Sequence, residues 1–385
     1  MKTDLSQKSR TNVIKAFSIK SVLTKGEIET ITKLSPASVS ILISVLEEEG
    51  IVERYDYGLS NGGRRPLLYK LRDSQFTSAD YRFSVSGITF SVIDINGNVA
   101  FSLDCEEQID SPDRLENAFL QLTERAEKLA PELIENVSAV GISIPGIINY
   151  SKNIVTLSVP LSLESYHMRP LVEKVYGKDI PLMLFNDSDA LLLGEYHFGN
   201  HGCENLALIM LDEGIGFSVI QNGSLMTSDN CGMELGHTVI SMNGDLCRCG
   251  RRGCASTFLN SDRIRADYSA ETEGRGCLGS HSYSDLAAKA NSGDEVALNV
   301  LSRQIYYLAV LAANTVNLFN PSKLLISSPL AAYDRFEELF DREVKGMALA
   351  PFAQSVKVCT SSMDIPASLA AMSRRLNARY YFETI

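Results

Sequence analysis

A segment with three closely spaced cysteines limits the possible folds of this chain more than any other stretch. Residues 244–256 read GDLCRCGRRGCAS, with thiols at Cys247, Cys249 and Cys254, and His237 precedes the first of them. Three thiolates and one imidazole are a common closed donor set for structural Zn²⁺. The spacing therefore predicts one zinc ion per chain, held by all four residues, with no open position for a metal-bound water. Chance clustering, the alternative, accounts poorly for this spacing after a histidine.

The other five cysteines are scattered, and the expected compartment decides their role. The first ten residues, MKTDLSQKSR, lack the apolar segment of a signal peptide, so we expect a cytoplasmic protein with reduced thiols. No apolar run of about 18 residues is present, so neither a membrane-spanning helix nor a membrane partner is expected. Disulfides are then not expected, and the scattered cysteines are predicted to be small core residues. These cysteines are Cys105, Cys203, Cys231, Cys277 and Cys359.

Residues 1–75 have the pattern of a DNA-binding head. They carry 12 Lys and Arg against 9 Asp and Glu, whereas the other 310 residues carry 24 against 38. A basic segment on an acidic body is expected where only that segment meets a polyanion. The spacing of apolar residues predicts helices over residues 12–20 and 25–34, and a third helix that ends at Gly50. Two helices joined by a tight turn indicate helix-turn-helix, and a plain three-helix bundle is the alternative.

The third helix of the head is predicted to lie against DNA. Ser35 is a good N-cap, and Pro36 suits the first helical turn. The buried stripe is predicted to consist of Val39, Leu42, Ile43 and Leu46. The outer face has small residues but no Arg, Lys, Asn or Gln, so direct base readout by bidentate pairs is limited. The candidate DNA contacts on this helix are Ser35, Ala37, Ser38 and Ser40, with Ser44 further along the same face.

The stretch after this helix is predicted to form a strand, a glycine-rich loop and a second strand, as in the wing of a winged helix. Its tip, residues 61–66, reads NGGRRP and places Arg64 and Arg65 on a flexible glycine stem. A slim arginine pair can enter a narrow minor groove, where the negative potential is strongest. A solvated hairpin tip is the alternative, although it would not need paired arginines. Much of the DNA affinity is therefore expected from the wing.

Residues 80–385 are predicted to form an α/β body. Residues 81–105 alternate apolar and polar side chains around the turn sequence INGN, which indicates a β-hairpin. A helix over residues 115–129, a strand over 139–145 and a strand–turn–strand unit over 205–223 follow. A long helix is predicted over residues 301–319.

Polar residues stand at the end of another buried strand, residues 180–187. Asn186 and Asp187 lie at its carboxyl end, which is the edge where open α/β sheets bind ligands. The alternative is that Asp187, Ser188 or Asp189 only caps the helix that follows. Position alone leaves both readings open.

Together these motifs resemble the ROK family of repressors, open reading frames and kinases, and in particular its repressor branch. The stretch GMELGHTVI followed by GDLCRCGRRGC is similar to the zinc signature of that family, and GGRRP is similar to the wing of its repressors. The resemblance implies an actin-like ATPase-type body with two lobes around a sugar cleft. The first lobe would cover about 80–195 plus the C-terminal helix, and the second about 196–368 with the zinc loop. It also implies a homodimer or homotetramer.

The resemblance assigns the sugar site to four residues. Family members hold sugar hydroxyls with an Asn-Asp pair and with the Glu and His of the zinc signature, which are Asn186, Asp187, Glu234 and His237 here. A further family Glu, two residues past the last cysteine, is Ser256 in this chain. Residues 159–170 depart from the family as well. We therefore expect a different sugar, a sugar phosphate or weak binding.

The positions that contact nucleotide in family kinases also depart from the pattern. The kinase sequence D-x-G-G-T aligns with residues 82–86, RFSVS, and the second phosphate loop aligns with residues 212–216, DEGIG. A later Gly-Gly pair reads Ser327-Ser328. Glycine amides cradle phosphates, whereas carboxylates repel them. We therefore expect no enzyme activity and no catalytic residue.

The sequence thus predicts a transcriptional regulator, a repressor of carbohydrate metabolism genes. Its affinity for a double-stranded DNA operator would be set by a sugar or sugar phosphate in the cleft between the lobes. One alternative is a sugar kinase with an appended head. Another is a regulator controlled by a protein partner, with a vestigial sugar cleft.

Overall fold

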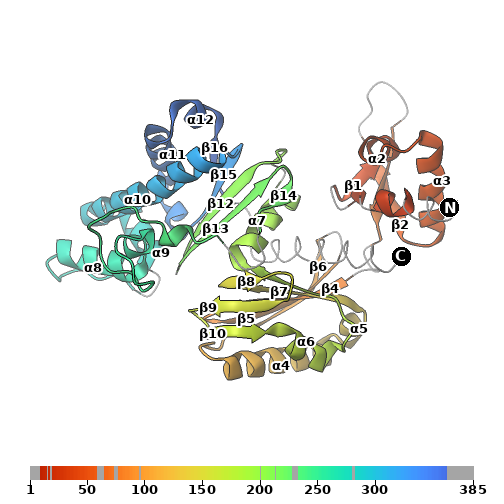
Figure 1. The fold of residues 1–385 in the computed structure, drawn as a ribbon, viewed down its shortest axis with the longest axis horizontal. Helices are drawn as coiled ribbons and strands as arrows, with labels where there is room; N and C mark the ends of the chain where they lie inside the picture. Colours follow the sequence, from red (N-terminus) through yellow and green to blue (C-terminus); the bar gives the residue numbers. More distant parts are fainter. Residues whose placement is uncertain are drawn as a thin grey trace. The chain divides into compact units, whose positions relative to one another are not determined.

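The computed structural model describes residues 9–14, 16–17, 20–58, 65–72, 77–94, 97–199, 201–212, 214–227, 233–279 and 282–361. The chain divides into two compact units, with Met1–Gly199 in the first and Asn200–Ser362 in the second. The ribbon in Figure 1 labels their helices and strands. The C-terminal helix predicted to join the first lobe lies outside the described residues.

The N-terminal part of the first unit contains a helix pair and a three-stranded sheet. Residues 9–14 and 16–17 are helical, near the helix predicted over 12–20, and the elements after them are β1 (Val22–Thr24), α2 (Lys25–Thr32), α3 (Pro36–Glu48), β2 (Val52–Tyr57) and β3 (Leu67–Leu71). The strands pair in the antiparallel order β1-β3-β2. The predicted strand–loop–strand after the helix pair is therefore confirmed, while its tip, residues 59–64, lies outside the described residues.

Local capping explains where these two helices begin. Thr24 accepts a hydrogen bond from the N–H of Glu27, whose carboxylate bonds back to the Thr24 N–H, which forms a capping box. Ser35 accepts from the N–H of Ser38, as an N-cap residue does, and Lys33 makes the turn between the helices with a positive φ of 59°. The predicted core residues Val39, Ile43 and Leu46 are fully buried, and Leu42 packs against them half-buried.

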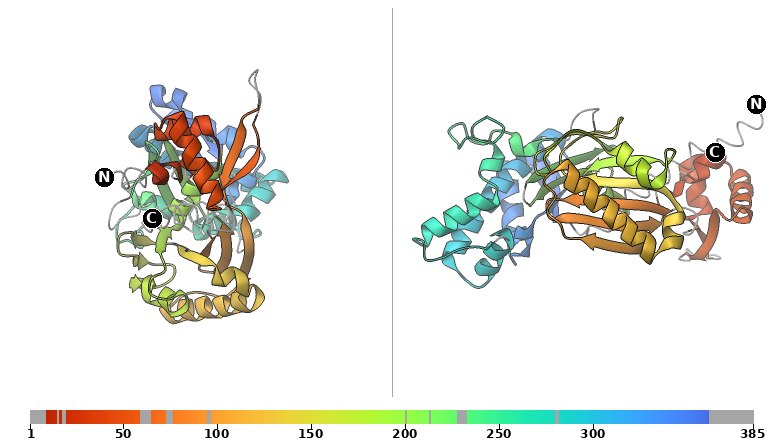
Figure 2. Two further views of the ribbon diagram at one scale, coloured as in Figure 1. Left: turned by 90° about the vertical axis from the view of Figure 1, so that its right-hand side faces the viewer. Right: turned by 90° about the horizontal axis from the view of Figure 1, so that it is seen from below.

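The rest of the first unit is built on a mixed five-stranded sheet of order β11-β7-β4-β5-β6. The strands are β4 (Thr77–Ser84), β5 (Gly87–Asp94), β6 (Val99–Cys105), β7 (Val137–Ile144) and β11 (Leu182–Asn186). Helices α4 (Pro112–Leu129) and α6 (Met168–Tyr176) cover one face, α7 (Asp187–Phe198) lies on the other, and α5 (Pro131–Glu135) follows α4 (Figures 1 and 2). A small sheet of β8 (Ile147–Asn149), β9 (Ile154–Ser158) and β10 (Leu163–His167) completes the unit.

The single hairpin predicted for residues 81–105 is in fact two. Strand β4 turns into β5 at Val85 and Ser86, and β5 and β6 pair on either side of the predicted INGN, whose first two residues lie outside the described residues. The first turn was missed because it lacks an Asn-Gly or Asp-Gly pair. Gly87 is required there, since its φ is 152° and an added Cβ would lie 2.1 Å from the Cys105 carbonyl oxygen.

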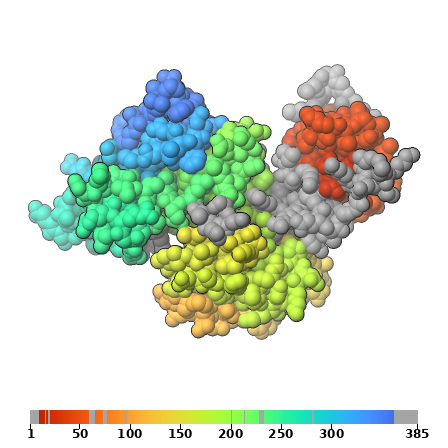
Figure 3. Space-filling view, viewed as in Figure 1, coloured from red at the N-terminus to blue at the C-terminus, as the bar shows by residue number. Residues whose placement is uncertain are grey.

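In the described part of the second unit, helices pack with a mixed sheet of order β14-β13-β12-β15-β16 (Figure 1). The strands are β12 (Leu206–Leu211), β13 (Ile215–Gln221), β14 (Ser224–Leu225), β15 (Lys323–Ser327) and β16 (Lys357–Thr360). The helices are α8 (Ser261–Glu271), α9 (Ser282–Asn291), α10 (Glu295–Phe319), α11 (Phe336–Met347) and α12 (Ala350–Ser355), with 3-10 turns η2 (Leu235–His237), η3 (Ala255–Thr257) and η4 (Pro329–Ala332). In the space-filling view of Figure 3, the described residues of this unit are coloured green to blue.

Helix α10 is the central helix of this unit. It begins before the predicted Leu301, because Asp294 accepts a hydrogen bond from the N–H of Ala297 and caps it at Glu295. Within the described chain it is the one continuous helix long and apolar enough to cross a membrane. However, 56% of its apolar window is buried inside the unit, where α8, α9 and α11 pack against it. It is therefore a core helix.

The scattered cysteines do not occupy the core positions that were expected. Cys105, Cys203 and Cys359 are half-buried and Cys277 is exposed, whereas Cys231 lies outside the described residues. Cys105 and Cys359 lie on β6 and β16, the outermost strands of their sheets. For Cys105 and Cys359 the core prediction was wrong because an edge strand is open to solvent on one side, which composition does not reveal.

Candidate functional site

The four predicted metal ligands come together in the second unit. The ligand atoms of His237, Cys247, Cys249 and Cys254 all lie within 4.8 Å of one another. The Nδ1 atom of His237 is 3.6 Å from Cys247 Sγ, and the sulfurs of Cys249 and Cys254 are 3.5 Å apart. Tetrahedral coordination at ordinary zinc bond lengths requires about 3.6 Å between nitrogen and sulfur and about 3.8 Å between sulfurs. The cluster therefore has the donors and the spacing to hold a metal ion.

Short backbone bonds hold these ligands in place. The N–H of Cys247 donates to the Arg251 carbonyl at 2.7 Å, and that of Gly253 donates to Asp245 at 2.9 Å. Gly253 has a φ of +74°, and a Cβ there would lie 1.6 Å from the Ser241 carbonyl oxygen. Only glycine fits this position, so the turn that brings the last two thiols together depends on it.

The thiols of the cluster differ in their electrostatic surroundings. Burial, followed by the neighbouring Cys249 and Cys247 thiols, raises the pKa of Cys254 to about 11. The backbone N–H of Arg251 lowers the pKa of the exposed Cys249. Three thiolates this close repel one another, so a bound cation is what would keep all of them deprotonated.

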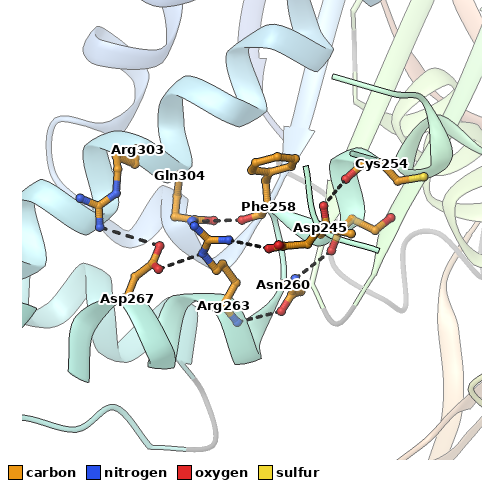
Figure 4. Close-up of polar contacts among 10 residues, drawn as sticks. Asp245, Cys254, Phe258, Asn260, Arg263, Asp267, Arg303 and Gln304 are labelled. Atoms are coloured by element: carbon orange, nitrogen blue, oxygen red, sulfur yellow. Dashed lines mark hydrogen bonds and ion pairs between the residues drawn. The ribbon is translucent and has the colours of Figure 1, made fainter. Parts of the chain in front are cut away.

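An ion-pair network joins the segment that carries the three cysteines to helices α8 and α10 (Figure 4). Arg263 on α8 contacts Asp245 at 3.1 Å and Asp267 at 2.8 Å. Arg303 on α10 lies 3.8 Å from the same Asp267. Gln304 on α10 also donates to the Phe258 carbonyl at 3.2 Å. The segment is thus tied to both helices and does not rest on the metal ligands alone.

The turn that carries His237 has its own support. Glu234 is exposed directly before η2, and the N–H of His237 donates to its carbonyl at 3.0 Å. Ser256, which stands where the family resemblance places a glutamate, donates through Oγ to the Gly236 carbonyl at 2.6 Å. The Glu234 carboxylate therefore faces solvent beside a histidine whose Nδ1 points to the thiols.

Asn186 and Asp187 lie together in the first unit, at the junction of β11 and α7. The Asn186 side-chain oxygen accepts from the Ser188 N–H at 2.9 Å, and its amide donates to the Gly146 carbonyl at 2.9 Å. The helix cap is therefore Asn186 and not Asp187, Ser188 or Asp189, because Asn186 has the extended backbone of a cap residue. Asp187 is the first helical residue, and one of its carboxylate oxygens accepts from the Ser188 N–H at 2.8 Å.

The sequence did not indicate one contact at this junction. The Tyr150 hydroxyl donates to the buried Asp189 carboxylate and accepts the backbone N–H of Asn186. Burial and the adjacent Asp189 raise the pKa of Tyr150, so it remains a neutral donor. No local signal could have found this pair, because its partners come from a loop after β8 and from α7.

The four predicted sugar ligands belong to different units. Asn186 and Asp187 lie in the first unit, and Glu234 and His237 lie in the second.

The predicted DNA contacts lie at the N-terminal part of α3, where Ser35 is exposed and Ser38 and Ser40 are half-buried, and directly before the second wing strand. The hydroxyls of Ser35 and Ser38 are 2.8 Å apart, and Lys25 Nζ donates to Ser40 Oγ at 2.9 Å. Ala37 is exposed, as is Arg65. Arg64 lies outside the described residues. The serine hydroxyls are therefore partly engaged by the head itself.

Comparison with known sequences gives a family and named relatives. Residues 85–372 match the ROK family. The xylose repressor of Caldicellulosiruptor bescii is 27% identical over 351 residues, which cover 88% of this chain and 86% of the relative. The DNA-binding transcriptional dual regulator NagC of Escherichia coli K12 is 24% identical over 357 residues, which cover 89% and 86%.

Comparison with solved structures confirms the α/β architecture. A ROK family transcriptional regulator, described as a homolog of the E. coli MLC protein, matches with a TM-score of 0.83 at 21% identity and covers 99% of this chain and 98% of its own. A ROK family glucokinase from Streptomyces griseus, solved with glucose and AMPPNP, matches with a TM-score of 0.66 at 19% identity. It covers 78% of this chain but 99% of its own, which leaves about a fifth of this chain unmatched.

Proposed function

The chain belongs to the ROK family, and on this premise we propose that it is a sugar-responsive transcriptional regulator, a repressor, that binds an operator through residues 1–75. One observation carries the proposal: the matched regulator covers 99% of this chain, whereas the matched glucokinase covers 78%. The difference is about the share of the chain that the head makes up. Two named relatives, a xylose repressor and NagC, are themselves gene regulators by name.

A kinase is the second candidate, and three sites oppose it. Arg82 and the Val85-Ser86 turn occupy the position of the first phosphate loop, without its aspartate or glycines. Asp212 would stand beside the phosphates at the second loop. Ser328 is an N-cap residue that accepts from the Leu330 N–H at 3.2 Å, in place of a glycine. A site with carboxylate and few free amides repels a triphosphate.

We assign the metal cluster to one structural Zn²⁺ per chain. The Cys3His donor set and the ligand spacing support this assignment. With four protein ligands no position is left for water, so the ion would stiffen residues 237–254 and take no part in a reaction. His237 would give Nδ1 to the metal, which leaves Nε2 for an effector hydroxyl.

We propose that the effector is a sugar or sugar phosphate held by Asn186, Asp187, Glu234 and His237. Two of these residues lie in each unit, so a sugar that binds all four would favour one arrangement of the units over another. In a homodimer or homotetramer, that preference would change the fit of two heads to half-sites a helical turn, or a multiple of it, apart. The operator affinity would then depend on the effector.

Fluorescence anisotropy with a labelled duplex, selected by the protein from a random pool, tests the proposal. The matching sugar should weaken DNA binding by about 5- to 150-fold, which is the usual range of allosteric coupling. Asp187→Asn keeps the oxygen that accepts from Ser188 but removes the charge. This variant should bind DNA as tightly as the parent, and added sugar should not change its DNA affinity. If this variant still releases DNA, control by a protein partner becomes the better account. ADP release with ATP and sugar would instead support the kinase.

A further inference from the structure

The solvent-facing side of α3 is apolar over three successive turns. Ile41 is 65% exposed and Val45 is 36% exposed, while Val39 and Ile43 on the opposite side are fully buried. Ala37, one turn before Ile41, is exposed as well. These three residues follow the four-residue spacing of a single helical stripe. A single exposed apolar side chain is ordinary, but three on consecutive turns form a surface.

The serines of α3 do not make this surface polar. Ser44 donates its hydroxyl to the Ser40 carbonyl at 3.0 Å, and Ser40 Oγ accepts from Lys25 Nζ at 2.9 Å. Ser38 shares a hydrogen bond of 2.8 Å with Ser35. The hydroxyl groups are thus turned toward the head's own atoms. What α3 offers to a partner is mainly the methyl groups of Ala37, Ile41 and Val45, which we call the methyl stripe.

The charge around the stripe indicates its partner. Residues 1–75 carry 12 Lys and Arg against 9 Asp and Glu, although the remaining chain is strongly acidic. Lys33, in the turn between α2 and α3, and Arg65, at the base of the wing, are both exposed. The N-terminus of α3 adds the positive end of the helix dipole beside Ser35. An apolar stripe on a segment with a net positive charge, in a chain that is otherwise acidic, fits the major groove of DNA better than an apolar protein surface.

We propose that Ile41, with Ala37 and Val45, reads the C5-methyl groups of thymines in the operator's major groove. Thymine is the one base that presents a methyl group there, and apolar side chains recognise it by contact. Ile41 is thus a specificity-determining residue, and the operator has thymines where α3 meets each half-site. This inference rests on the proposed DNA-binding function and adds the base that the helix recognises.

Replacing thymine with deoxyuridine tests the inference. Uracil keeps the base pair and the minor groove but lacks the methyl group. The full chain is used with the duplex that it selects from a random pool, and binding is measured by anisotropy. Each lost methyl contact should weaken binding about fourfold, since burial of one methyl-sized group is worth about 0.8 kcal/mol. Ile41→Ala should weaken binding to the thymine duplex but add no loss on the deoxyuridine duplex.

Controls separate this inference from the proposed function. Ile41 is exposed, so Ile41→Ala should melt like the parent, and Leu129→Ala, a 63% exposed residue at the end of α4, should leave DNA binding unchanged. Equal losses on both duplexes, or no loss on either, would overturn the thymine contact while DNA binding stands. A change in oligomeric state on light scattering, with no uracil effect, would make the stripe a protein interface. A chain that binds no duplex at all would contradict the proposed function itself.

Discussion

The hydroxyl of Ser256 donates a hydrogen bond of 2.6 Å to the backbone carbonyl of Gly236, which joins the segment after the last thiol to the turn that carries His237. A Cβ at Gly236 would lie 2.7 Å from that hydroxyl oxygen, so both residues must stay small. The resemblance to sugar-binding ROK proteins places a glutamate at this position. In this chain the residue is an internal support of the turn, which leaves the recognition of sugar to the remaining ligands.

Ser256→Ala should lower the free energy of unfolding by about 1 kcal/mol, because the carbonyl of the buried Gly236 loses its partner. Urea unfolding of the full chain measures the difference. Ser302→Ala is the matched control, since that exposed serine donates to the Leu298 carbonyl at 2.7 Å on the surface of α10. Equal effects for both variants would mean that the Ser256 bond is no more than a surface contact.

Zinc should be present at one ion per chain after purification without added metal, as measured by elemental analysis. Cys249→Ser should lose the ion and lower the melting temperature, because structural zinc contributes directly to folding. Cys277→Ser removes an exposed cysteine outside the cluster and should change neither quantity. A parent chain with a zinc content near zero would contradict the assignment.

The double change Arg64→Ala and Arg65→Ala should weaken operator binding strongly. It should also make the dependence of log K on log salt concentration shallower by about two units, since each phosphate contact contributes about 0.9. Anisotropy titrations over a range of salt concentrations provide both values. Arg248→Ala with Arg251→Ala removes the same charge from exposed residues of the second unit. If both double variants behave alike, net charge and not the wing is responsible.

Tyr150→Phe should destabilise the protein by about 2 kcal/mol, because the buried Asp189 carboxylate loses the hydroxyl that donates to it. The phenyl ring fills the same space, so packing should be preserved. Tyr57→Phe, at a ring that is 56% exposed on the wing, serves as the control in urea unfolding. A null effect of Tyr150→Phe would show that Asp189 finds another donor.

Asp80→Asn should stabilise the protein increasingly as the pH rises. Asp80 is fully buried, and burial raises its pKa well above the ordinary value. Its neutral form therefore fits the fold, and the stability associated with that form is present below about pH 4 and is lost as the pH rises through the raised pKa. The amide does not titrate and keeps an oxygen for the Ser78 hydroxyl, which lies 2.6 Å from the Asp80 carboxylate.

Urea unfolding at about pH 4.5 and about pH 8, both above the ordinary aspartate pKa of about 3.9, should show a larger advantage of Asp80→Asn at the higher pH. Asp179→Asn, at an exposed aspartate, should show no such trend. An advantage that is constant or falls with pH would contradict a raised pKa at Asp80.

The sequence by itself determined those features of this protein that depend on residues close together in the chain. The sequence predicted Ser35 as the cap of α3, because a serine followed by proline and an apolar stripe is a helix-start signal contained in a few residues. It predicted the wing strands from the alternation of apolar and polar residues over two short segments. The metal cluster follows from the spacing of Cys247, Cys249 and Cys254, since a short chain between ligands keeps them near one another. Family resemblance extended these local signals to the α/β body.

Only the tertiary structure decided the contacts between distant segments. Tyr150 is hydrogen-bonded to Asp189, 39 residues away in the sequence, and Ser256 to Gly236, 20 residues away. No sequence pattern predicts either pair. Which side of α3 faces solvent, and hence the exposure of Ile41, depends on what packs against Val39 and Ile43. Spacing along the chain specifies hydrogen bonds and ligands that are close in sequence, whereas burial is a property of the neighbours that folding brings together.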